Sequence, residues 1–248
     1  MLRVLILCIA LLLPCQAWAL TFVNRADGDS TSTASQVINV PTSTADGNVL
    51  WMMIKRTSST TDPNSGLTGW TQVAKQSVTS ASTYWIYCRI ASSEPASYTV
   101  GWAGADRTGI TMVAYAYSGS GNCSTGITVV QTQYTTSDTT VRAATLTPAD
   151  SSSVLFLFYG VHSTASNTLS TPSNPTGVTS NVDDIFSAAG RFEREIGSVT
   201  LASASATGSM DSTWGGAAIT DKQAFAIALT TEGGAAASPK LGLLGVGR

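Results

Sequence analysis

The chain has 248 residues, of which 43% are hydrophobic and 11% charged, with 13 Lys and Arg against 15 Asp and Glu. The hydrophobic share is sufficient for a folded core, which excludes a wholly disordered chain, although the charged share is low for a globular domain. The small net negative charge, with no basic run, excludes nucleic-acid binding driven by phosphate neutralisation.

The N-terminal segment has the three parts of an export signal. Arg3 gives a positive start, residues 4–13 are apolar, and Ala17-Trp18-Ala19 matches the small-residue cleavage pattern. The apolar stretch is short for a bilayer span. We therefore expect residues 1–19 to be a signal peptide and the mature chain to begin at Leu20, exported to the periplasm, the cell surface or the medium, without a stable membrane span. A buried N-terminal helix is the alternative.

Short apolar segments separated by turn-forming residues fill the rest of the chain. Clusters such as Asp62-Pro63-Asn64-Ser65-Gly66 mark the turns. No stretch has a capped helical period, so the evenly spaced short strands predict an all-β, antiparallel sandwich. The predicted strands are 21–24, 37–40, 49–54, 69–73, 84–91, 98–102, 111–117, 140–146, 154–159, 190–196, 199–202 and 223–229.

The two halves of the chain resemble each other weakly. Five segments of the first half have counterparts in the second: 37–41 with 140–148, 49–51 with 154–156, 69–71 with 177–179, 85–90 with 191–196, and 113–117 with 224–229. Two similar halves suit a double Greek key, and we predict a single jelly-roll-like sandwich over residues 20–231. Two tandem sandwiches are the alternative, although no Pro/Gly linker separates the halves. Residues 232–248, rich in Gly, Ala and Leu, are expected to form a flexible tail or the remnant of an attachment signal.

Two cysteines remain after removal of the signal peptide, Cys88 and Cys123. An even pair in an exported protein favours a disulfide, and two unpaired thiols are the alternative.

Residues suited to catalysis are scarce. His162 is the only histidine and no serine lies in a nucleophile-elbow pattern, so neither a Ser-His site nor a zinc site is favoured. Glu193 and Glu195 alternate on one predicted strand with Arg191 on the same face, which is typical of an ion-paired surface rather than of a glycosidase pair. Residues 27–31 offer oxygens for calcium, but a polar turn is favoured. We expect no enzyme, no metal and no cofactor.

The aromatic residues are the most suggestive feature. In the strand 84–91 the alternation places Ile86, Cys88 and Ile90 in the core, which leaves Trp85, Tyr87 and Arg89 on an outer face.

Tyr115 and Tyr117 share a face of the strand 111–117. Flat aromatic rows with a planar Arg suit sugar rings. We therefore predict ligand binding by Trp85, Tyr87, Arg89, Tyr115 and Tyr117, against the alternative that these rings pack under a loop or between subunits.

Four motifs follow one another in the chain: Asp46-Gly47-Asn48-Val49-Leu50, Gly69-Trp70-Thr71, residues 87–91 with 93–99, and Ala116-Tyr117-Ser118-Gly119. In this order they resemble those of a broad group of uncharacterised β-sandwich proteins of phages and secreted bacterial proteins. The resemblance covers residues 36–231 and implies a jelly-roll-like fold with a virion- or surface-associated role. It carries over no catalytic residues, and the export signal favours a bacterial exported protein.

Two functions remain in view. The first is a non-catalytic exported module that binds carbohydrate or a surface polymer. The second is a structural subunit of a virion or cell-surface appendage that forms homo-oligomers through exposed strands or the C-terminal tail. A hydrolase is a distant third, because no acid or base pair is apparent.

Overall fold

In a computed structural model of the protein, the described residues are 20–57, 60–78, 82–117, 122–134, 139–149, 153–163, 170–173, 176–186, 191–201, 205–215 and 221–230. The predicted signal peptide and C-terminal tail lie outside them. The described part contains thirteen β-strands and no helix, so it has no helix long and apolar enough to cross a membrane. The all-β, antiparallel class predicted from the sequence is confirmed.

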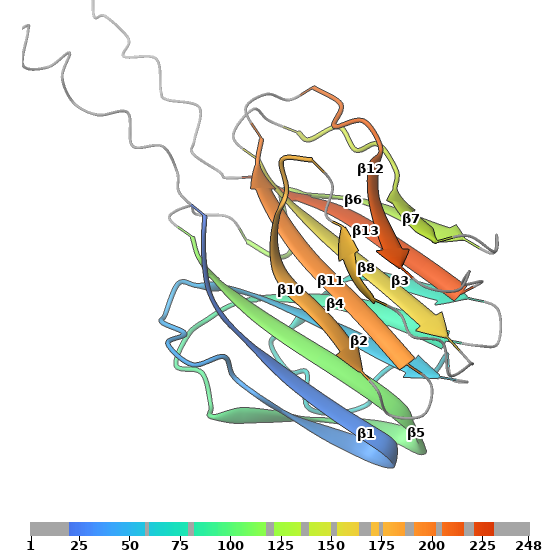
Figure 1. Cartoon of the computed structure of the whole chain (residues 1–248). Helices are drawn as coiled ribbons and strands as arrows, with labels where there is room; N and C mark the ends of the chain where they lie inside the picture. The colour runs from blue at the N-terminus through green and yellow to red at the C-terminus, as the bar shows by residue number, and fades with distance from the viewer. Residues whose placement is uncertain are drawn as a thin grey trace, which may run out of the picture.

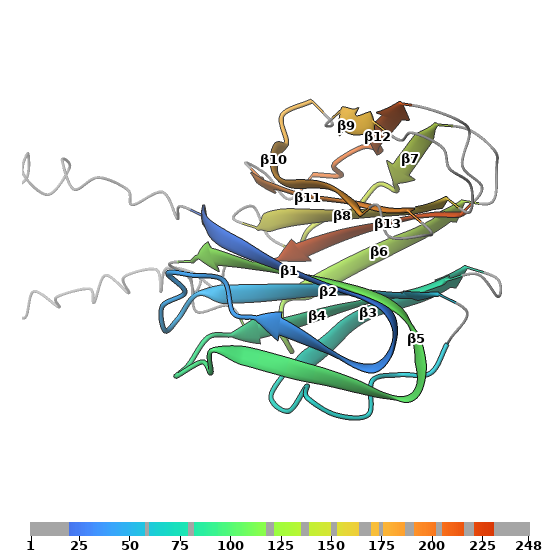
Figure 2. The same ribbon diagram turned by 60° about the horizontal axis from the view of Figure 1, so that its bottom comes forward.

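Two five-stranded antiparallel sheets face each other, and a small third sheet covers one of them (Figures 1 and 2). The first sheet has the order β1-β5-β2-β4-β3, with β1 (Thr21–Asn39), β2 (Val49–Thr57), β3 (Thr71–Val78), β4 (Ser82–Ile90) and β5 (Ser97–Ala116). The second has the order β10-β11-β8-β13-β6, with β6 (Ile127–Tyr134), β8 (Val154–Ser163), β10 (Thr179–Phe186), β11 (Arg191–Thr200) and β13 (Asp221–Leu229). The third, which we call the cover sheet, has the order β7-β12-β9, with β7 (Thr140–Ala143), β9 (Ser170–Ser173) and β12 (Met210–Gly215).

Each large sheet is drawn from one half of the chain, and the two have the same strand order. Read from the first strand of each half, the orders are β1-β5-β2-β4-β3 and β6-β13-β8-β11-β10. Four of the five sequence matches between the halves occupy equivalent places, namely β2 with β8, β3 with β10, β4 with β11 and β5 with β13. The fifth match is wrong, because 37–41 lies in and after β1 of the first large sheet whereas 140–148 includes β7 of the cover sheet. A jelly roll exchanges strands between its two sheets, whereas here each large sheet takes all its strands from one half of the chain. The molecule is therefore a face-to-face pair of sheets with a repeated order.

The same kind of turn precedes the equivalent strands β3 and β10. Gly69 has φ 81° and Gly177 has φ 84°, both in the left-handed region that glycine adopts without steric cost. Each glycine lies two residues before the first residue of its strand. The shared backbone conformation explains why Gly recurs at the start of the two matched segments.

The central core lies between the two large sheets. Trp51 of β2 contacts Phe156 and Phe158 of β8, with ring centroids 4.9 and 5.7 Å apart. Tyr115 of β5 meets Phe156 edge to face at 5.1 Å. All four side chains are fully buried. Aromatic contacts of this geometry add about 1 kcal/mol each beyond area burial, so this cluster holds the two sheets together.

The outer face of the first sheet is covered by the chain itself. Residues 33–39 of β1 pair with residues 97–106 of β5, and the register between the two strands shifts twice between Ser30 and Ser35. This part of the β1–β5 pair, here called the folded-back ribbon, bends under the sheet (Figure 2). It forms a second buried cluster with the sheet, whose members include Ile38, Val100 and Trp102 of the ribbon and Leu50, Met52, Ile54, Ile110 and Met112 of the sheet.

The outer face of the second sheet is covered in the same way by the cover sheet. Trp214 of β12 and Val141 of β7 pack against Leu155 and Leu157 of β8, and all four are buried. The central strands β2, β8 and β13 are therefore buried on both faces. This explains their continuous apolar runs, which are uncommon in antiparallel sheets with one solvated face.

The sequence predicted many strands and missed others. Residues 98–102 and 111–116 of two predicted strands belong to the single long strand β5, and residues 191–196 and 199–200 of two others belong to β11. The predicted set lacked β6, β9, β10 and β12. Residues 27–31, expected as a polar turn, instead lie in β1, where Thr111 Oγ1 donates to Asp27 Oδ1 at 2.7 Å.

Candidate functional site

The predicted outer row of Trp85 and Tyr87 is wrong, because both side chains are buried. Trp85 has 0% and Tyr87 6% of its surface exposed, and both belong to the cluster beneath the folded-back ribbon. Their polar atoms have partners inside the protein: Trp85 Nε1 donates to Asp62 Oδ1 at 2.7 Å, and Tyr87 Oη donates to Gln72 Oε1 at 2.9 Å. Burial raises the pKa of the Tyr87 phenol, with a smaller contribution from the Asp62 charge. The alternation of the strand was correct, but its second face is also core.

Tyr115 and Tyr117 lie on the opposite side of the first sheet from Trp85. Tyr115 is fully buried in the central core, and Phe22 meets it edge to face at 5.7 Å. Tyr117 is half-buried beside the same core, and its hydroxyl donates to the Thr230 carbonyl at 3.3 Å. The structure therefore does not bring the five predicted ligand-binding residues together on one surface.

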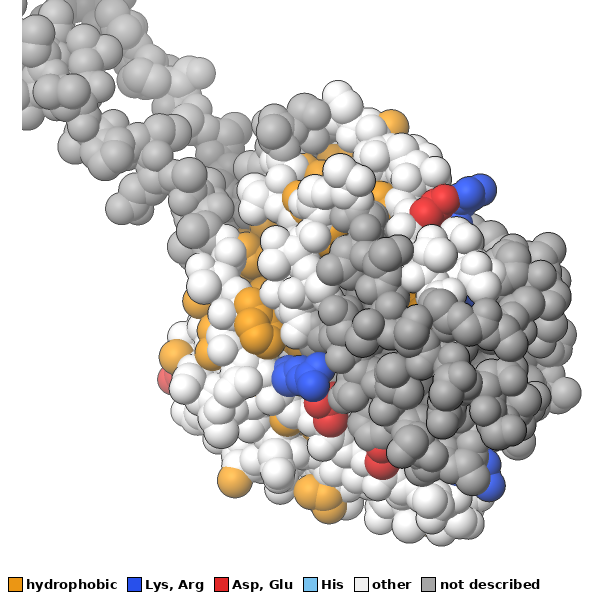
Figure 3. All heavy atoms as spheres, in the orientation of Figure 1, with side chains coloured by type: hydrophobic (Ala, Val, Ile, Leu, Met, Phe, Trp, Pro, Cys, Tyr) orange, Lys and Arg blue, Asp and Glu red, His pale blue; other side chains and the backbone are white. Residues whose placement is uncertain are grey.

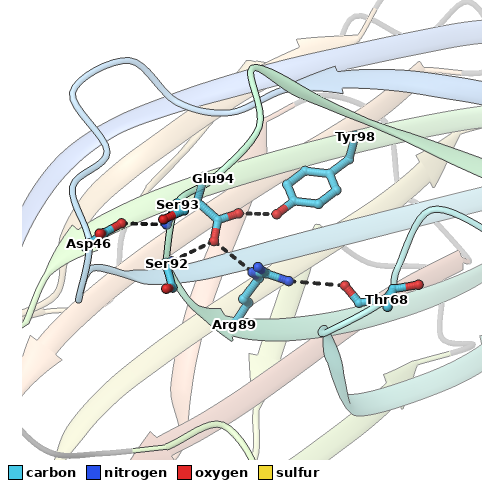
Figure 4. A network of polar contacts seen from close by, with 7 residues as sticks. All are labelled: Asp46, Thr68, Arg89, Ser92, Ser93, Glu94 and Tyr98. Carbon is cyan, nitrogen blue, oxygen red and sulfur yellow. Dashed lines mark hydrogen bonds and ion pairs between the residues drawn. The ribbon is translucent and has the colours of Figure 1, made fainter.

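Arg89 is the centre of a network of internal contacts (Figure 4). Its Nε donates to Glu94 Oε1 at 2.8 Å and its Nη1 to the Thr68 carbonyl at 3.1 Å. Tyr98 Oη donates to the other Glu94 oxygen, and the Ser92 amide donates to Oε1 at 2.9 Å. The guanidinium also lies 5.9 Å from the Tyr98 ring centroid.

The partners in this network shift the pKa values of Glu94 and Tyr98. Burial opposes ionisation of Glu94, but donors from Tyr98, Ser92 and Arg89 outweigh it and lower the pKa of that carboxyl. Burial and the hydrogen bond to Glu94 raise the pKa of Tyr98 to about 12. The network joins loops that are distant in sequence, since the neighbouring Ser93 amide donates to Asp46 Oδ1 at 2.7 Å. We interpret Arg89 as a structural residue that connects these loops through its hydrogen bonds.

The motif residues of the sequence converge on this network. Asp46, Gly69, Arg89, Glu94 and Tyr98 come from three of the four motifs and meet at one end of the first sheet. A Cβ on Gly69 would lie 2.4 Å from Arg89 Nη1, so the close approach of the Gly69 turn also depends on glycine. These motifs therefore specify loop structure.

The predicted disulfide is present. Cys88 of β4 is bonded to Cys123, with their Cα atoms 5.4 Å apart. Both residues belong to the central core. The bond ties the first sheet to the segment that leads into the second.

The residues considered for catalysis lie at strand positions whose side chains are outside the described set. The backbone register pairs His162 of β8 with Phe192 of β11 and Asp221 of β13. Glu193 and Glu195 of β11 pair with Val161 and Tyr159 of β8. Among the residues that the structure describes, no three His, Cys, Asp or Glu side chains are grouped to hold a metal ion.

A groove lies on the open side of the sandwich, between the edge strands β1 and β10. Its volume is about 380 Å³, within the usual range for a small-molecule site. It is lined by residues 20–22 at the start of β1, by Gly177, Thr179 and Asn181 around the start of β10, and by residues 198–200 of β11. The opposite pair of edges is closed by apolar contacts, because Val73 of β3 and Val129 of β6 pack against the central core.

The polar part of the groove is organised around Asn181. Its Nδ2 lies 3.0 Å from Ser198 Oγ, 3.1 Å from Tyr115 Oη and 3.2 Å from the Thr179 carbonyl. These contacts connect β10 to β11 and to the first sheet. Tyr115 does not line the groove, but its hydroxyl accepts a hydrogen bond from the lining residue Asn181, and burial raises the pKa of that phenol. Leu20, Phe22 and Val199 supply the apolar part of the lining.

The groove has no ionisable side chain among its nine lining residues. In the described part of the face drawn in Figure 3, uncharged polar and hydrophobic atoms predominate, with a Lys or Arg beside acidic side chains near the middle of the view. Thr179 and Thr200 are exposed, whereas Asn181 and Ser198 are half-buried. The lining can donate and accept hydrogen bonds and offers apolar contact, without selecting strongly for charge.

Sequence reasoning missed the groove because β10 was not predicted. The signal was present, since Gly177-Val178-Thr179 matches Gly69-Trp70-Thr71, which precedes β3. Extending that match would have placed Thr179 and Asn181 on an edge strand.

No protein-family model, no curated protein and no solved structure matches this chain.

Proposed function

We propose that the protein is a non-catalytic, exported module that binds a hydroxyl-rich polymer, most simply a glycan, in the groove between β1 and β10. The observation that carries this proposal is the lining itself: hydroxyls and an amide beside Leu20 and Phe22, with no ionisable side chain. This combination suits sugar rings, because they present hydroxyl edges and apolar faces to a protein.

The burial of the other surfaces supports this location. The outer face of the first sheet is covered by the folded-back ribbon, and part of the second by the cover sheet. The groove is flanked by β1 and β10, which are terminal strands of their sheets. An extended polymer therefore has an approach along the edge strands.

The disulfide supports the exported location. Bonds of this kind persist in oxidising compartments such as the periplasm and the extracellular space. The Cys88–Cys123 bond is consistent with such a compartment, and the sequence of residues 1–19 agrees with it.

The experiment is glycan-array binding by the mature chain, after size-exclusion chromatography with light scattering has established its oligomeric state. Thr179→Trp places a large side chain in the groove. Thr179 is exposed and lies in a strand, where Trp is as well tolerated as Thr. Thr99→Trp makes the same change at an exposed position of β5 outside the groove and is the matched control. We expect Thr179→Trp to weaken binding at least about tenfold and Thr99→Trp to leave it unchanged. Equal binding by both variants would place the ligand elsewhere.

A structural subunit is the second candidate, favoured by the edge of β1. This 19-residue strand pairs with β5 and is the terminal strand of its sheet, so its other edge presents backbone donors and acceptors. Such edges can pair with another copy. A stable oligomer or filament without any glycan signal would favour this function over the first.

A further inference from the structure

The charge of the groove depends on where the mature chain begins. Leu20 is one of its lining residues and immediately precedes β1. In the uncut chain the nitrogen of Leu20 is a neutral amide. Cleavage after Ala19 would turn it into an α-ammonium group, which is protonated near neutral pH. The nearest charged side chains on the same strand, Arg25 and Asp27, form an ion pair with each other at 3.4 Å.

We propose that signal cleavage completes the groove by placing the α-ammonium of Leu20 beside lining residues that, among those the structure describes, have no ionisable side chain, and that the ligand is a glycan bearing carboxylate groups. The inference rests on the proposed function and on cleavage after Ala19. The precursor and the mature protein then differ in ligand preference, although their strands are the same.

A single α-ammonium group in the groove favours a ligand with isolated carboxylates over a densely charged polymer. The chain has more acidic than basic residues and no basic run, so a polyanion gains few ion pairs and meets a net negative protein. A uronic-acid residue within a glycan presents one carboxylate beside its hydroxyls. The α-ammonium contacts the carboxylate, while Ser, Thr and Asn groups of the lining contact the hydroxyls.

The test begins with the full chain expressed in a bacterial host that exports it, and with the N-terminus read by mass spectrometry. An N-terminus other than Leu20 overturns the inference at once. The mature protein is then applied to an array that carries each uronic-acid glycan beside its neutral methyl ester. A second sample is acetylated near pH 6.5, where the α-amino group reacts ahead of lysine, and the modified site is verified by peptide mapping.

We expect the mature protein to bind acidic glycans about tenfold more tightly than their esters, and the acetylated protein to bind both forms alike. Equal binding of acid and ester before acetylation, or a preference that survives it, overturns the inference and leaves the proposed function intact. The loss of every glycan signal, neutral and acidic, overturns both. The Thr179→Trp variant further distinguishes the inference from the proposed function, because it should weaken binding of the acid and of its ester together.

Discussion

Reduction of the Cys88–Cys123 bond should lower the free energy of unfolding by about 4 kcal/mol. The bond joins residues 35 positions apart. In the chain-entropy treatment, a loop of this size removes about 13 cal/mol/K from the unfolded chain, which is about 3.8 kcal/mol at 25 °C. In a domain of this size each kcal/mol corresponds to roughly 2–4 °C in Tm, so we expect Tm to fall by about 8–16 °C.

The assay compares urea unfolding of the oxidised protein and of the protein unfolded and refolded with reductant, followed by tryptophan fluorescence. The reduced wild type is the better comparison, because it retains both sulfur atoms in the core. Cys88→Ala with Cys123→Ala also loses their packing and should be destabilised at least as much. The reduced chain should also show a larger m-value, since its unfolded state exposes more surface. A difference below about 1 kcal/mol, or free thiols in the unreduced protein, would refute the reasoning.

Three further substitutions test the internal contacts. Glu94→Gln should cost more stability at pH 7 than at pH 3, because a carboxyl with a lowered pKa stabilises the fold above its unfolded pKa of about 4.3 and loses that contribution as the pH falls through the folded value. Urea unfolding at both pH values checks this, and equal losses would contradict it. Gly69→Ala should lower the thermal stability more than Gly47→Ala. Both glycines have a positive φ, which costs alanine about 1 kcal/mol of strain, but only a Cβ at Gly69 would meet Arg89. Equal losses of stability in the two variants would contradict the contact. Trp85→Ala should cost about 3–5 kcal/mol, because the side chain is fully buried; a loss below about 1 kcal/mol would mean that the ring is exposed as first predicted.

The fold class follows from local sequence patterns. The strand predicted at 49–54 is a continuous apolar run bounded by a turn, and β2 occupies it. The strands β10 and β12 were missed because Asn, Asp, Ser and Gly within them favour turns. β6 was also missed, although its Val and Thr content favours a strand.

The burial of Trp85 and Tyr87 was not predictable from their own strand. Alternation divides the side chains of β4 into two faces, but it does not say what covers each face. The cover includes Ile38, Val100 and Trp102, which lie beneath the sheet because the irregular pair of strands β1 and β5 folds back there. A contact between segments so far apart in sequence leaves no periodic signal in either.

The groove could not be predicted from the sequence for the same reason. Asn181 and Ser198 lie on paired strands of the second sheet, whereas Phe22 lies on the first, so the groove exists only where the two sheets face each other. Sequence reasoning found Tyr115, which contacts this network, but assigned its ring to the surface. In the structure the ring is core and the hydroxyl alone reaches Asn181.

The most direct test of the account is to map a bound glycan by amide chemical shifts, using isotope-labelled mature protein and the strongest ligand from the array. The account predicts that the shifted amides concentrate at residues 21–22, 177–181 and 198–200, while the folded-back ribbon and the cover sheet remain unchanged. Shifts centred on Trp85, Tyr87 and Arg89 or on another surface, with these three segments unaffected, would contradict it.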